Sequence, residues 1–295
     1  MAAALSHAIL PPSGARAEAR CREIGCGPFS DTPDGLYRGY LTPSFFAAQR
    51  QLRAWMEQAG MSVRLDQAAN LIGRYEGSNP AAPALIIGSH LDSVRNGGCY
   101  DGPLGILLGI ELIAVLHAEG RRFPFPIEVY AFGDEEGSRF PKAMLTSRAV
   151  AGTLSAEELA VCDAAGISLA DAGVEVASFL AAARPRHELL AYLETHIEQG
   201  PVLEAEGLAV GTVTGIVAQR RYVIEVVGMA GHAGTVTMAH RRDALAGASE
   251  MVCAIERFAL GDGGDLVATV GQLQAYPGAQ NVIAGKVRFT LDVRS

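Results

Sequence analysis

The chain of 295 residues carries a net charge of −8 and is 49% hydrophobic, so it is long and apolar enough for two modest domains with hydrophobic cores. The negative charge argues against nucleic acid as a partner, and Gly, His or charged residues interrupt each apolar stretch before it reaches the length of a membrane span. The five cysteines are scattered without a CxxC pair, which excludes a disulfide framework or a zinc ribbon and fits a reducing compartment. Residues 1–20 show no secretory signal, so we expect a globular, cytoplasmic protein without a membrane partner.

Up to about residue 195 the pattern is that of an α/β domain. Residues 1–30 have no clear pattern, and we expect the start of the chain to be poorly ordered. Strands then alternate with helices, and Gly and Pro stand between them. The predicted elements are helix 44–59, strands 63–65, 71–75 and 84–88, helix 103–118, strand 127–132, helices near 141–150, 155–163 and 175–183, and strand 189–195. This alternation favours a mainly parallel sheet.

The pattern changes near residue 213, where we expect a second domain to begin. The predicted elements are an alternating strand over 222–227, an amphipathic helix over 242–258 and alternating strands over 266–273 and 286–293. This βαββ order is typical of a small α+β module with a ferredoxin-like arrangement, in which the helix covers one face of the sheet. We therefore predict two domains, 1–212 and 213–295.

Polar side chains with metal-ligand chemistry follow three of the predicted strands. They are His90, Asp92 and Asp101 after strand 84–88, Glu135 and Glu136 after strand 127–132, and His196 after strand 189–195. Because the carboxyl ends of parallel strands meet at one edge of a sheet, we expect these side chains to lie together. Imidazole and carboxylate groups suit Zn²⁺ or Mn²⁺ better than Ca²⁺ or an iron–sulfur cluster.

The positions of these residues also indicate separate roles. The Asp101 carboxylate can bridge two metals roughly 3.5–4 Å apart, and Asp92 can accept the ring N–H of His90 and fix its tautomer. In the pair Glu135-Glu136, one carboxylate can bind metal while the other takes a proton from water. Ordinary explanations remain open for each residue, namely a hydrogen-bonded His, a solvated Glu pair and a helix N-cap at Asp101. The recurrence of one ligand chemistry at three strand ends is what favours a dimetal hydrolase.

Five motifs, in order from about residue 30 to the end of the chain, resemble those of the M20 metallopeptidase-like family. More narrowly, they resemble its allantoate amidohydrolase and N-carbamoyl-L-amino acid hydrolase branch, also called the hydantoinase/carbamoylase branch. The motifs are GSHLDSVRNGGCYDGPLG, FGDEEGSRFP, ETHIEQGPVLE, GMAGHAGTVTMAHRRDAL and PGAQNVIAGKVRFTLDVRS. Plain aminopeptidases of the broader family do not typically carry the HIEQGPVLE and AGHAGT forms together.

The resemblance implies two divalent metal ions, Mn²⁺ or Zn²⁺, at the first domain. The implied ligands are His90, Asp101, Glu136 and His196. Asp101 would bridge the two ions, and the Asp101–Gly102 peptide would be cis. Glu135 would be the general base, and Asp92 would orient His90.

For the second domain, the resemblance implies a lid that also joins two subunits into a homodimer. The implied substrate-binding residues are Gln219, His232, Asn281 and Arg294. His232 would reach the partner subunit's active site and stabilise the oxyanion, while Asn281 and Arg294 would bind the substrate carboxylate. On their residue types alone, His232 between glycines would be a turn residue and Arg294 a surface charge at the end of a strand.

The implied reaction is the hydrolysis of a ureido C–N bond beside a carboxylate. The first candidate is the conversion of allantoate, a small molecule of purine catabolism, to ureidoglycine, ammonia and CO₂. Hydrolysis of N-carbamoyl-L-amino acids is the near alternative, because the metal ligands would be identical.

Two features depart from the pattern of the resembled family. Thr237 replaces the usual Pro in HAGTVTM, which we expect to reduce backbone stiffness near His232. The resemblance also implies a continuation after Ser295 that would supply a further His ligand. We therefore keep open a truncated, inactive chain that acts only as a dimerising module and leaves an exposed sheet edge.

Overall fold

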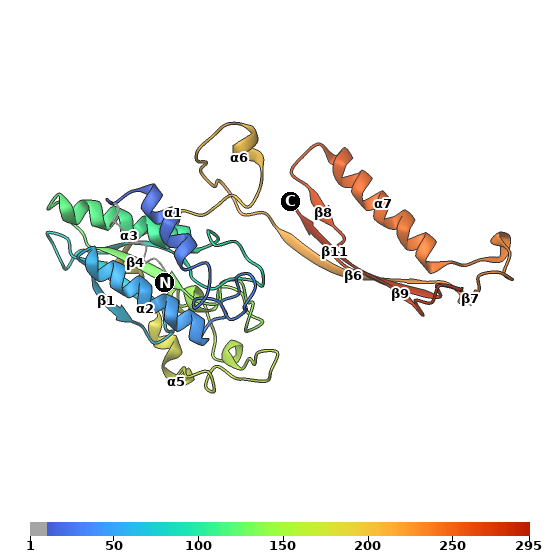
Figure 1. Ribbon diagram of the computed structural model, residues 1–295, viewed down its shortest axis with the longest axis horizontal. Coiled ribbons are helices and arrows are strands. Elements are labelled where there is room, and N and C mark those ends of the chain that lie inside the picture. The colour runs from blue at the N-terminus through green and yellow to red at the C-terminus, as the bar shows by residue number, and fades with distance from the viewer. Residues whose placement is uncertain (1–10) are drawn as a thin grey trace, which may run out of the picture. The chain divides into compact units, whose positions relative to one another are not determined.

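The computed structural model describes residues 11–295 (Figure 1). It divides into two compact units, residues 1–201 and 202–295, so the boundary predicted at 212/213 falls inside the second unit. The start of the chain that we expected to be poorly ordered, residues 1–10, lies outside the described residues. None of the helices in the described range is both long and apolar enough to cross a membrane.

The first unit is built on a five-stranded sheet in the order β1-β2-β4-β3-β5. Its strands are β1 Ser62–Leu65, β2 Leu71–Tyr75, β3 Ala84–His90, β4 Ile127–Phe132 and β5 Leu189–Leu193. Strand β3 runs parallel to β4 and β5, whereas β1 and β2 are joined by a tight turn and are antiparallel. The sheet is therefore mixed, and its parallel part consists of the three strands that precede the predicted ligands.

Helices cover the sheet where its strands are most apolar. Every residue of β4 is buried, as are all but one of β3. Helix α2 (Pro43–Gln58) packs on β1 and β2, and helix α3 (Pro103–Ala118) packs on β3 and β4. Both helices begin with a proline, which is tolerated there because the first helical N–H has no partner inside the helix. The predicted helices 44–59 and 103–118 are thereby confirmed.

Helix α1 (Gly14–Glu23) was not predicted, because its sequence is polar and only two of its side chains are buried. A tertiary ion pair holds it against α3. The buried Glu111 of α3 accepts hydrogen bonds from Arg16 Nε at 2.8 Å and from Arg20 Nη1 at 2.8 Å. Such a contact between distant segments leaves no periodic pattern in the sequence.

A long connection with little regular structure joins β4 to β5. It contains α4 (Leu145–Val150), α5 (Val176–Phe179) and 3₁₀-helices at Glu157–Leu159, Leu180–Ala182 and Arg186–Glu188. The predicted helix 155–163 is wrong except for that first short turn. The chain then turns at Asp163, whose carboxylate accepts the backbone N–H groups of Ala165 and Ile167.

A buried ion-pair network ties this connection back to the sheet. Glu128 on β4 is 2% exposed and pairs with Arg74 at 2.9 Å and with Arg184 at 2.8 Å. Burial alone would raise the pKa of Glu128, but the hydrogen bond from Arg74 and the charge of Arg184 outweigh it, so the pKa lies below its usual value. The ionised carboxylate therefore stabilises the folded state.

We expect Glu128→Gln to lower the free energy of unfolding at pH 7 by about 2–3 kcal/mol, because both arginines lose their buried counter-charge. Since the folded pKa is depressed, this contribution is complete above the unfolded carboxyl's pKa of about 4.3 and is lost as the pH falls through the folded value. Urea unfolding of the unchanged protein and of Glu128→Gln, at pH 7 and near pH 3, measures the difference in their free energies of unfolding. The exposed Glu76, which also pairs with Arg74, is the control, and Glu76→Gln should cost less than about 1 kcal/mol. An equal Glu128 effect at both pH values would contradict this account.

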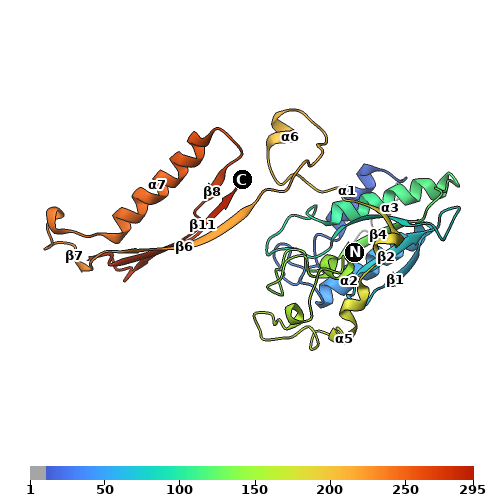
Figure 2. The ribbon, with the colours of Figure 1, turned by 180° about the vertical axis from the view of Figure 1, so that it is seen from behind.

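The second unit has a single helix against an antiparallel sheet, as Figure 2 shows from behind. The sheet contains β6 Gln219–Val227, β8 Val267–Thr269, β9 Leu273–Tyr276 and β11 Lys286–Arg294. Two short strands, β7 Gly231–His232 and β10 Val282–Ile283, form a separate two-stranded sheet. The helices of this unit are α6 Val202–Ala205, α7 Ala244–Asp262 and a 3₁₀-helix at Met238–His240. Asp243 caps α7, whose Ala244 and Ala248 are buried in a cluster with Val287 and Phe289 of β11.

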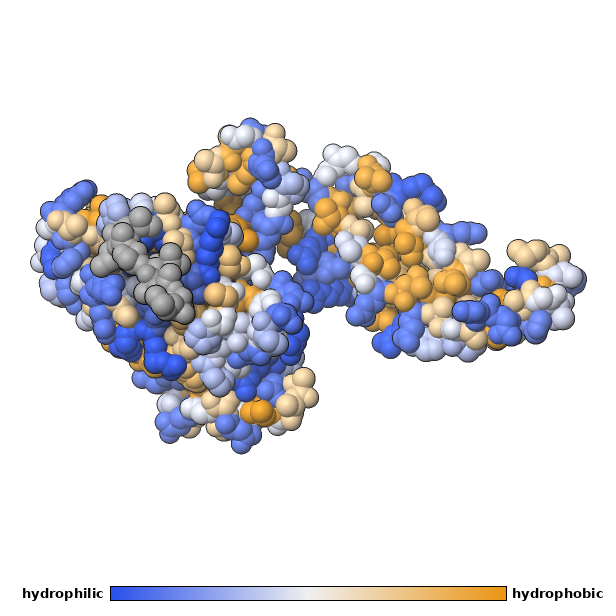
Figure 3. Space-filling model, viewed as in Figure 1, coloured by the Kyte–Doolittle hydropathy of each residue, from blue (hydrophilic) through white to orange (hydrophobic). Residues whose placement is uncertain are grey.

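The predicted βαββ order is confirmed, with one break. The strand expected over 266–273 is divided at Gly271 into β8 and β9, and both pieces pair with β11. Large apolar side chains remain exposed in both units, and orange atoms are visible across the surface in Figure 3. In β5, at one edge of the first sheet, Leu190, Tyr192 and Leu193 are each about half exposed.

Candidate metal centre

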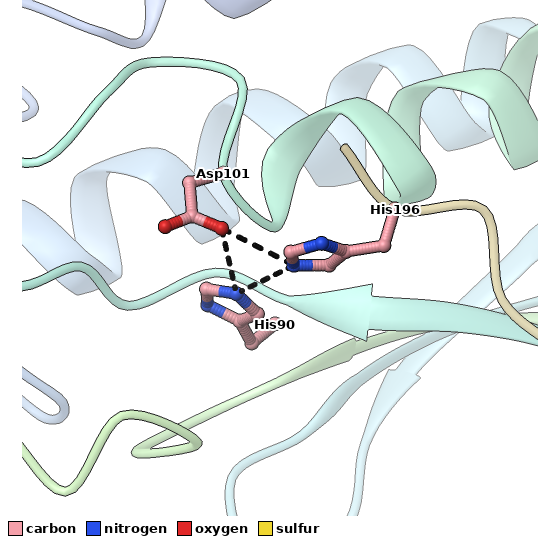
Figure 4. Close-up of side chains that lie close together, drawn as sticks. All are labelled: His90, Asp101 and His196. Carbon is pink, nitrogen blue, oxygen red and sulfur yellow. Dashed lines mark hydrogen bonds and ion pairs between the residues drawn. The ribbon is translucent and has the colours of Figure 1, made fainter. Parts of the chain in front are cut away.

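The parallel strands bring two histidines and a carboxylate to one point (Figure 4). His90 is the last residue of β3, Asp101 precedes α3, and His196 follows β5. The Asp101 Oδ1 atom lies 3.2 Å from His196 Nε2 and 3.8 Å from His90 Nε2. The two Nε2 atoms lie 3.4 Å apart. Three residues from three separate segments thus point their ligand atoms at a common centre.

Backbone carbonyls orient both imidazole rings. His90 Nδ1 lies 2.9 Å from the carbonyl oxygen of Asp92, and His196 Nδ1 lies 2.9 Å from that of Ile197. Because a carbonyl oxygen can only accept, each Nδ1 carries the proton, and each neutral ring turns the lone pair of Nε2 toward the other ring and Asp101. This is the arrangement that metal-binding histidines commonly show.

The spacing of these atoms fits a metal ion. Two imidazole nitrogens bound tetrahedrally at 2.0–2.1 Å from one ion would lie about 3.3 Å apart, close to the 3.4 Å between His90 and His196. Among the described residues, the buried Asp101 Oδ1 makes no hydrogen bond. An acceptor and two lone pairs that face one another without a proton donor are what a cation would satisfy.

A second group of ligand atoms shares His90. Glu135, Glu136 and His90 offer atoms that lie within 4.8 Å of one another, as do those of His90, Asp101 and His196. The predicted ligand residues are therefore all brought together at the edge of the sheet. The general base predicted from the sequence, Glu135, lies beside them.

The Asp92 side chain holds the glutamates rather than the histidine. Its two carboxylate oxygens accept the backbone N–H groups of Glu135 at 3.1 Å and of Glu136 at 3.2 Å. The nearest carboxylate oxygen is 3.7 Å from His90 Nδ1, because the Asp92 carbonyl occupies the position where the side chain was expected. Asp92 thus connects the end of β3 to the loop after β4 with both its main chain and its side chain.

The charges around this centre favour a bound cation. Burial alone would lower the pKa of His90, but the neighbouring Asp101 carboxylate and the charges of Asp92 and Glu135 outweigh it and raise the pKa to about 9. The facing His90 ring lowers the pKa of Asp101. Burial raises the pKa of both Glu135 and Glu136, and neighbouring carboxylates add to the effect. The surrounding carboxylates thus favour a positive charge at this point. A proton on His90 supplies that charge without a metal, and a divalent ion bound to the neutral ring would replace the proton.

The peptide bond between Asp101 and Gly102 differs from our expectation. The cis peptides of the described residues are Gly27–Pro28 and Tyr276–Pro277, so the expected cis bond at Asp101–Gly102 is not found. Gly102 instead turns the chain into α3 with a φ of 83°, a value that favours glycine.

Sequence reasoning missed one residue of this centre. Gln199 donates a hydrogen bond of 2.9 Å from Nε2 to Asp101 Oδ2, which leaves Oδ1 facing the histidines. Its φ of 56° is unusual for a residue other than glycine. The ETHIEQGP motif that places His196 also contains Gln199, so its position near the site was the available signal.

The second unit places its four predicted residues in two pairs. His232 on β7 pairs with Val282 of β10, next to Asn281, whose carbonyl accepts the N–H of Ala233. Gln219 and Arg294 pair across β6 and β11, and both side chains donate to Asp292, at 2.7 and 3.0 Å. The pairs lie near opposite ends of β11, whose nine residues span roughly 26 Å. One carboxylate cannot meet both Asn281 and Arg294 of the same chain.

A main-chain N–H group fixes the tautomer of the His232 ring. Gly234 N–H donates to His232 Nδ1 at 3.0 Å, so the neutral ring carries its proton on Nε2 and can donate from there. Thr237, at the position of the usual proline, bonds His240 Nδ1 through its hydroxyl at 2.8 Å. Arg241 donates to the carbonyls of Val236 and Ala233. Side-chain hydrogen bonds thus hold this loop in place of a proline.

Histidines and carboxylates that meet at the ends of parallel strands are typical of a metal-dependent hydrolase built on an α/β sheet. The chain belongs to the family described as Peptidase family M20/M25/M40, whose profile matches residues 86–286. This confirms the resemblance of its motifs.

Its relatives narrow the class further. The chain is 46% identical to the N-carbamoyl-L-amino acid amidohydrolase of Geobacillus stearothermophilus, covering 92% of this chain and 68% of that protein. It is 38% identical to the allantoate deiminase of Arabidopsis thaliana, covering 95% of this chain and 58% of that protein. The crystal structure of an amidase of the hydantoinase/carbamoylase family from Burkholderia multivorans matches with a TM-score of 0.84 at 37% identity, covering 96% of this chain and 69% of that one. The chain thus spans between 58% and 69% of the length of these proteins.

Proposed function

We propose that this chain forms the metal-binding and substrate-binding parts of an amidohydrolase that cleaves a ureido C–N bond, with allantoate as the first candidate substrate. The observation that carries the proposal is the cluster of His90, Asp101 and His196 with Glu135 beside it. The relatives named amidohydrolase and deiminase support the same reaction class.

The cofactor of the proposed site is a pair of divalent ions, Mn²⁺ or Zn²⁺. His90, Asp101 and His196 would hold one ion, and Asp101 with Glu136 would contact the second. When bound, such ions lower the pKa of a water molecule and polarise the substrate carbonyl. Gln199 fixes one oxygen of Asp101, which keeps the other directed at the histidines.

Glu135 is the general base of the proposed reaction. Burial raises the pKa of its carboxyl, which brings its basicity closer to neutral pH, where proton transfer is most effective. Its Oε atom would accept a proton from the attacking water and deliver it to the leaving nitrogen. The main chain that carries Glu135 is fixed by Asp92, so the carboxylate starts from a defined position.

The second unit supplies the proposed substrate contacts and the subunit interface of a homodimer. Arg294 and Gln219 would bind the substrate carboxylate, for which they exchange their bonds to Asp292. His232 Nε2–H would donate to the developing oxyanion. Because Asn281 and Arg294 of one chain lie too far apart for one carboxylate, we assign His232 and Asn281 to the site of the partner subunit. All five cysteines are free, in keeping with a reducing cytoplasm.

Ammonia release tests the proposal and its alternative. The chain is purified with Mn²⁺ or Zn²⁺ and assayed on allantoate and on several N-carbamoyl-L-amino acids, the second candidate, which the 46% identity favours. Release from one class and not the other identifies the substrate. We expect a chelator to abolish the release and either ion to restore it, because the proposed reaction needs the ions to lower the pKa of the attacking water. If the chain with full metal content released no ammonia from any of these substrates, the result would contradict the proposal and favour a dimerising module without activity.

A further inference from the structure

The loop that carries Glu135 begins with Gly133, whose main-chain N–H and C=O groups have no partner in the sheet. Pairing between β3 and β4 ends at His90 and Phe132, and the Phe132 carbonyl accepts its last bond from Leu91. The next residue, Gly133, is buried, and its N–H and C=O lie beyond the sheet. Buried backbone groups need partners, so something other than a strand must supply them here.

Thr146 of α4 supplies both. Its hydroxyl accepts the Gly133 N–H at 2.8 Å and donates to the Gly133 carbonyl at 2.9 Å. The Thr146 side chain is fully buried. The main-chain N–H of Thr146 also donates to the Gly133 carbonyl, at 3.4 Å, and this bond would remain in a Val or Ala variant. The Gly133 N–H depends on the hydroxyl as its acceptor, which neither Val nor Ala provides.

The same segment holds the following two residues. Leu145 N–H donates to the Asp134 carbonyl at 3.2 Å, and Met144 N–H donates to the Glu135 carbonyl at 2.8 Å. On the other side, the Asp92 carboxylate takes the Glu135 N–H. Both main-chain polar groups of Glu135 are therefore bound, one toward β3 and one toward the start of α4.

We propose that Thr146 is a positioning residue for Glu135. Its hydroxyl fixes Gly133 and keeps residues 144–146 aligned with residues 133–135, so that the Glu135 carboxylate is presented beside His90. The proposal rests on the assigned role of Glu135 as general base. If Thr146 served only the stability of the core, its loss would lower the melting temperature without moving Glu135.

The test compares Thr146→Val, which keeps the shape and removes the hydroxyl, with Thr146→Ser, which keeps the hydroxyl. Tyr75→Phe is the matched control, because it removes another buried hydroxyl that bonds the carbonyl of Arg121 far along the chain. Hydrogen exchange of the peptide covering residues 132–136 and the kcat and KM of ammonia release are measured for each. Thr146→Ala replaces the Val variant if the latter does not fold.

In Thr146→Val we expect the amide hydrogens of this peptide to exchange about tenfold faster than in the unchanged protein. We also expect kcat to fall by about tenfold to a hundredfold, with KM and metal content unchanged. Thr146→Ser should behave as the unchanged protein, and Tyr75→Phe should alter neither readout. Unchanged exchange in Thr146→Val overturns the proposal, as does faster exchange with unchanged kcat. If the unchanged protein releases no ammonia, the proposed function fails, and the exchange measurement alone decides whether Thr146 holds this loop.

Discussion

Ala in place of Gly102 should weaken metal binding by about a hundredfold or more, the upper range for disturbing the surroundings of a metal ligand. Gly102 has a φ of 83°, and a Cβ atom there would lie closest to the His90 carbonyl oxygen, with which it clashes, and 2.6 Å from both Cε1 and Nδ1 of the His90 ring. The ring cannot move without breaking its bond to the Asp92 carbonyl, which sets the direction of Nε2. Titration calorimetry with Mn²⁺ or Zn²⁺ measures the loss.

Substitutions at two other glycines separate the backbone strain of Gly102→Ala from its clash with His90. Gly120 also has a positive φ, of 64°, but a Cβ there meets nothing within 4 Å, so Gly120→Ala should cost about 1–2 kcal/mol of stability and leave metal binding unchanged. Gly98 has open space and no positive φ, so Gly98→Ala should change neither. If Gly102→Ala lost only as much stability as Gly120→Ala and bound metal normally, His90 would not be a ligand.

The parts of the fold that were predictable are those that repeat along the chain. The runs of buried residues in β3 and β4 and the long apolar run of α3 extend over whole elements, and Gly and Pro separate them. Parallel strand ends meet by geometry, so the meeting of His90 and His196 follows once β3 and β5 are identified. The family resemblance then distinguishes Glu136 from Glu135, which the residue types alone do not.

The parts that were not predictable depend on single contacts between distant segments. Helix α1 is held by Glu111, and the loop after β4 is held by Asp92 and Thr146. Each is a side chain that bonds a main chain or a charge elsewhere, and such contacts have no period in the sequence. The separation of Asn281 and Arg294 could not be predicted for a similar reason, because it depends on how β11 pairs with its neighbouring strands. A motif can thus name a residue without showing which partner it meets.

Glu135→Gln should reduce kcat by about a hundredfold to ten-thousandfold, the usual contribution of a general base. An amide has the shape of the carboxylate and leaves the main-chain bonds to Asp92 and Met144 intact, so the loop should keep its position. It cannot accept the proton of the attacking water. Because Glu135 is not an assigned ligand, metal content and KM should change little, as measured by metal analysis and steady-state ammonia release.

Glu136→Gln is the matched variant for this test, since the two neighbours share the same loop and both N–H groups bond to Asp92. It should lower metal affinity by about tenfold to a hundredfold, because a neutral amide replaces an assigned anionic ligand. Activity should return in part at high metal concentration. Added metal should not restore Glu135→Gln, because its defect lies in proton transfer. If metal rescued Glu135→Gln while Glu136→Gln stayed inactive at full metal content, the assignments of the two glutamates would have to be exchanged.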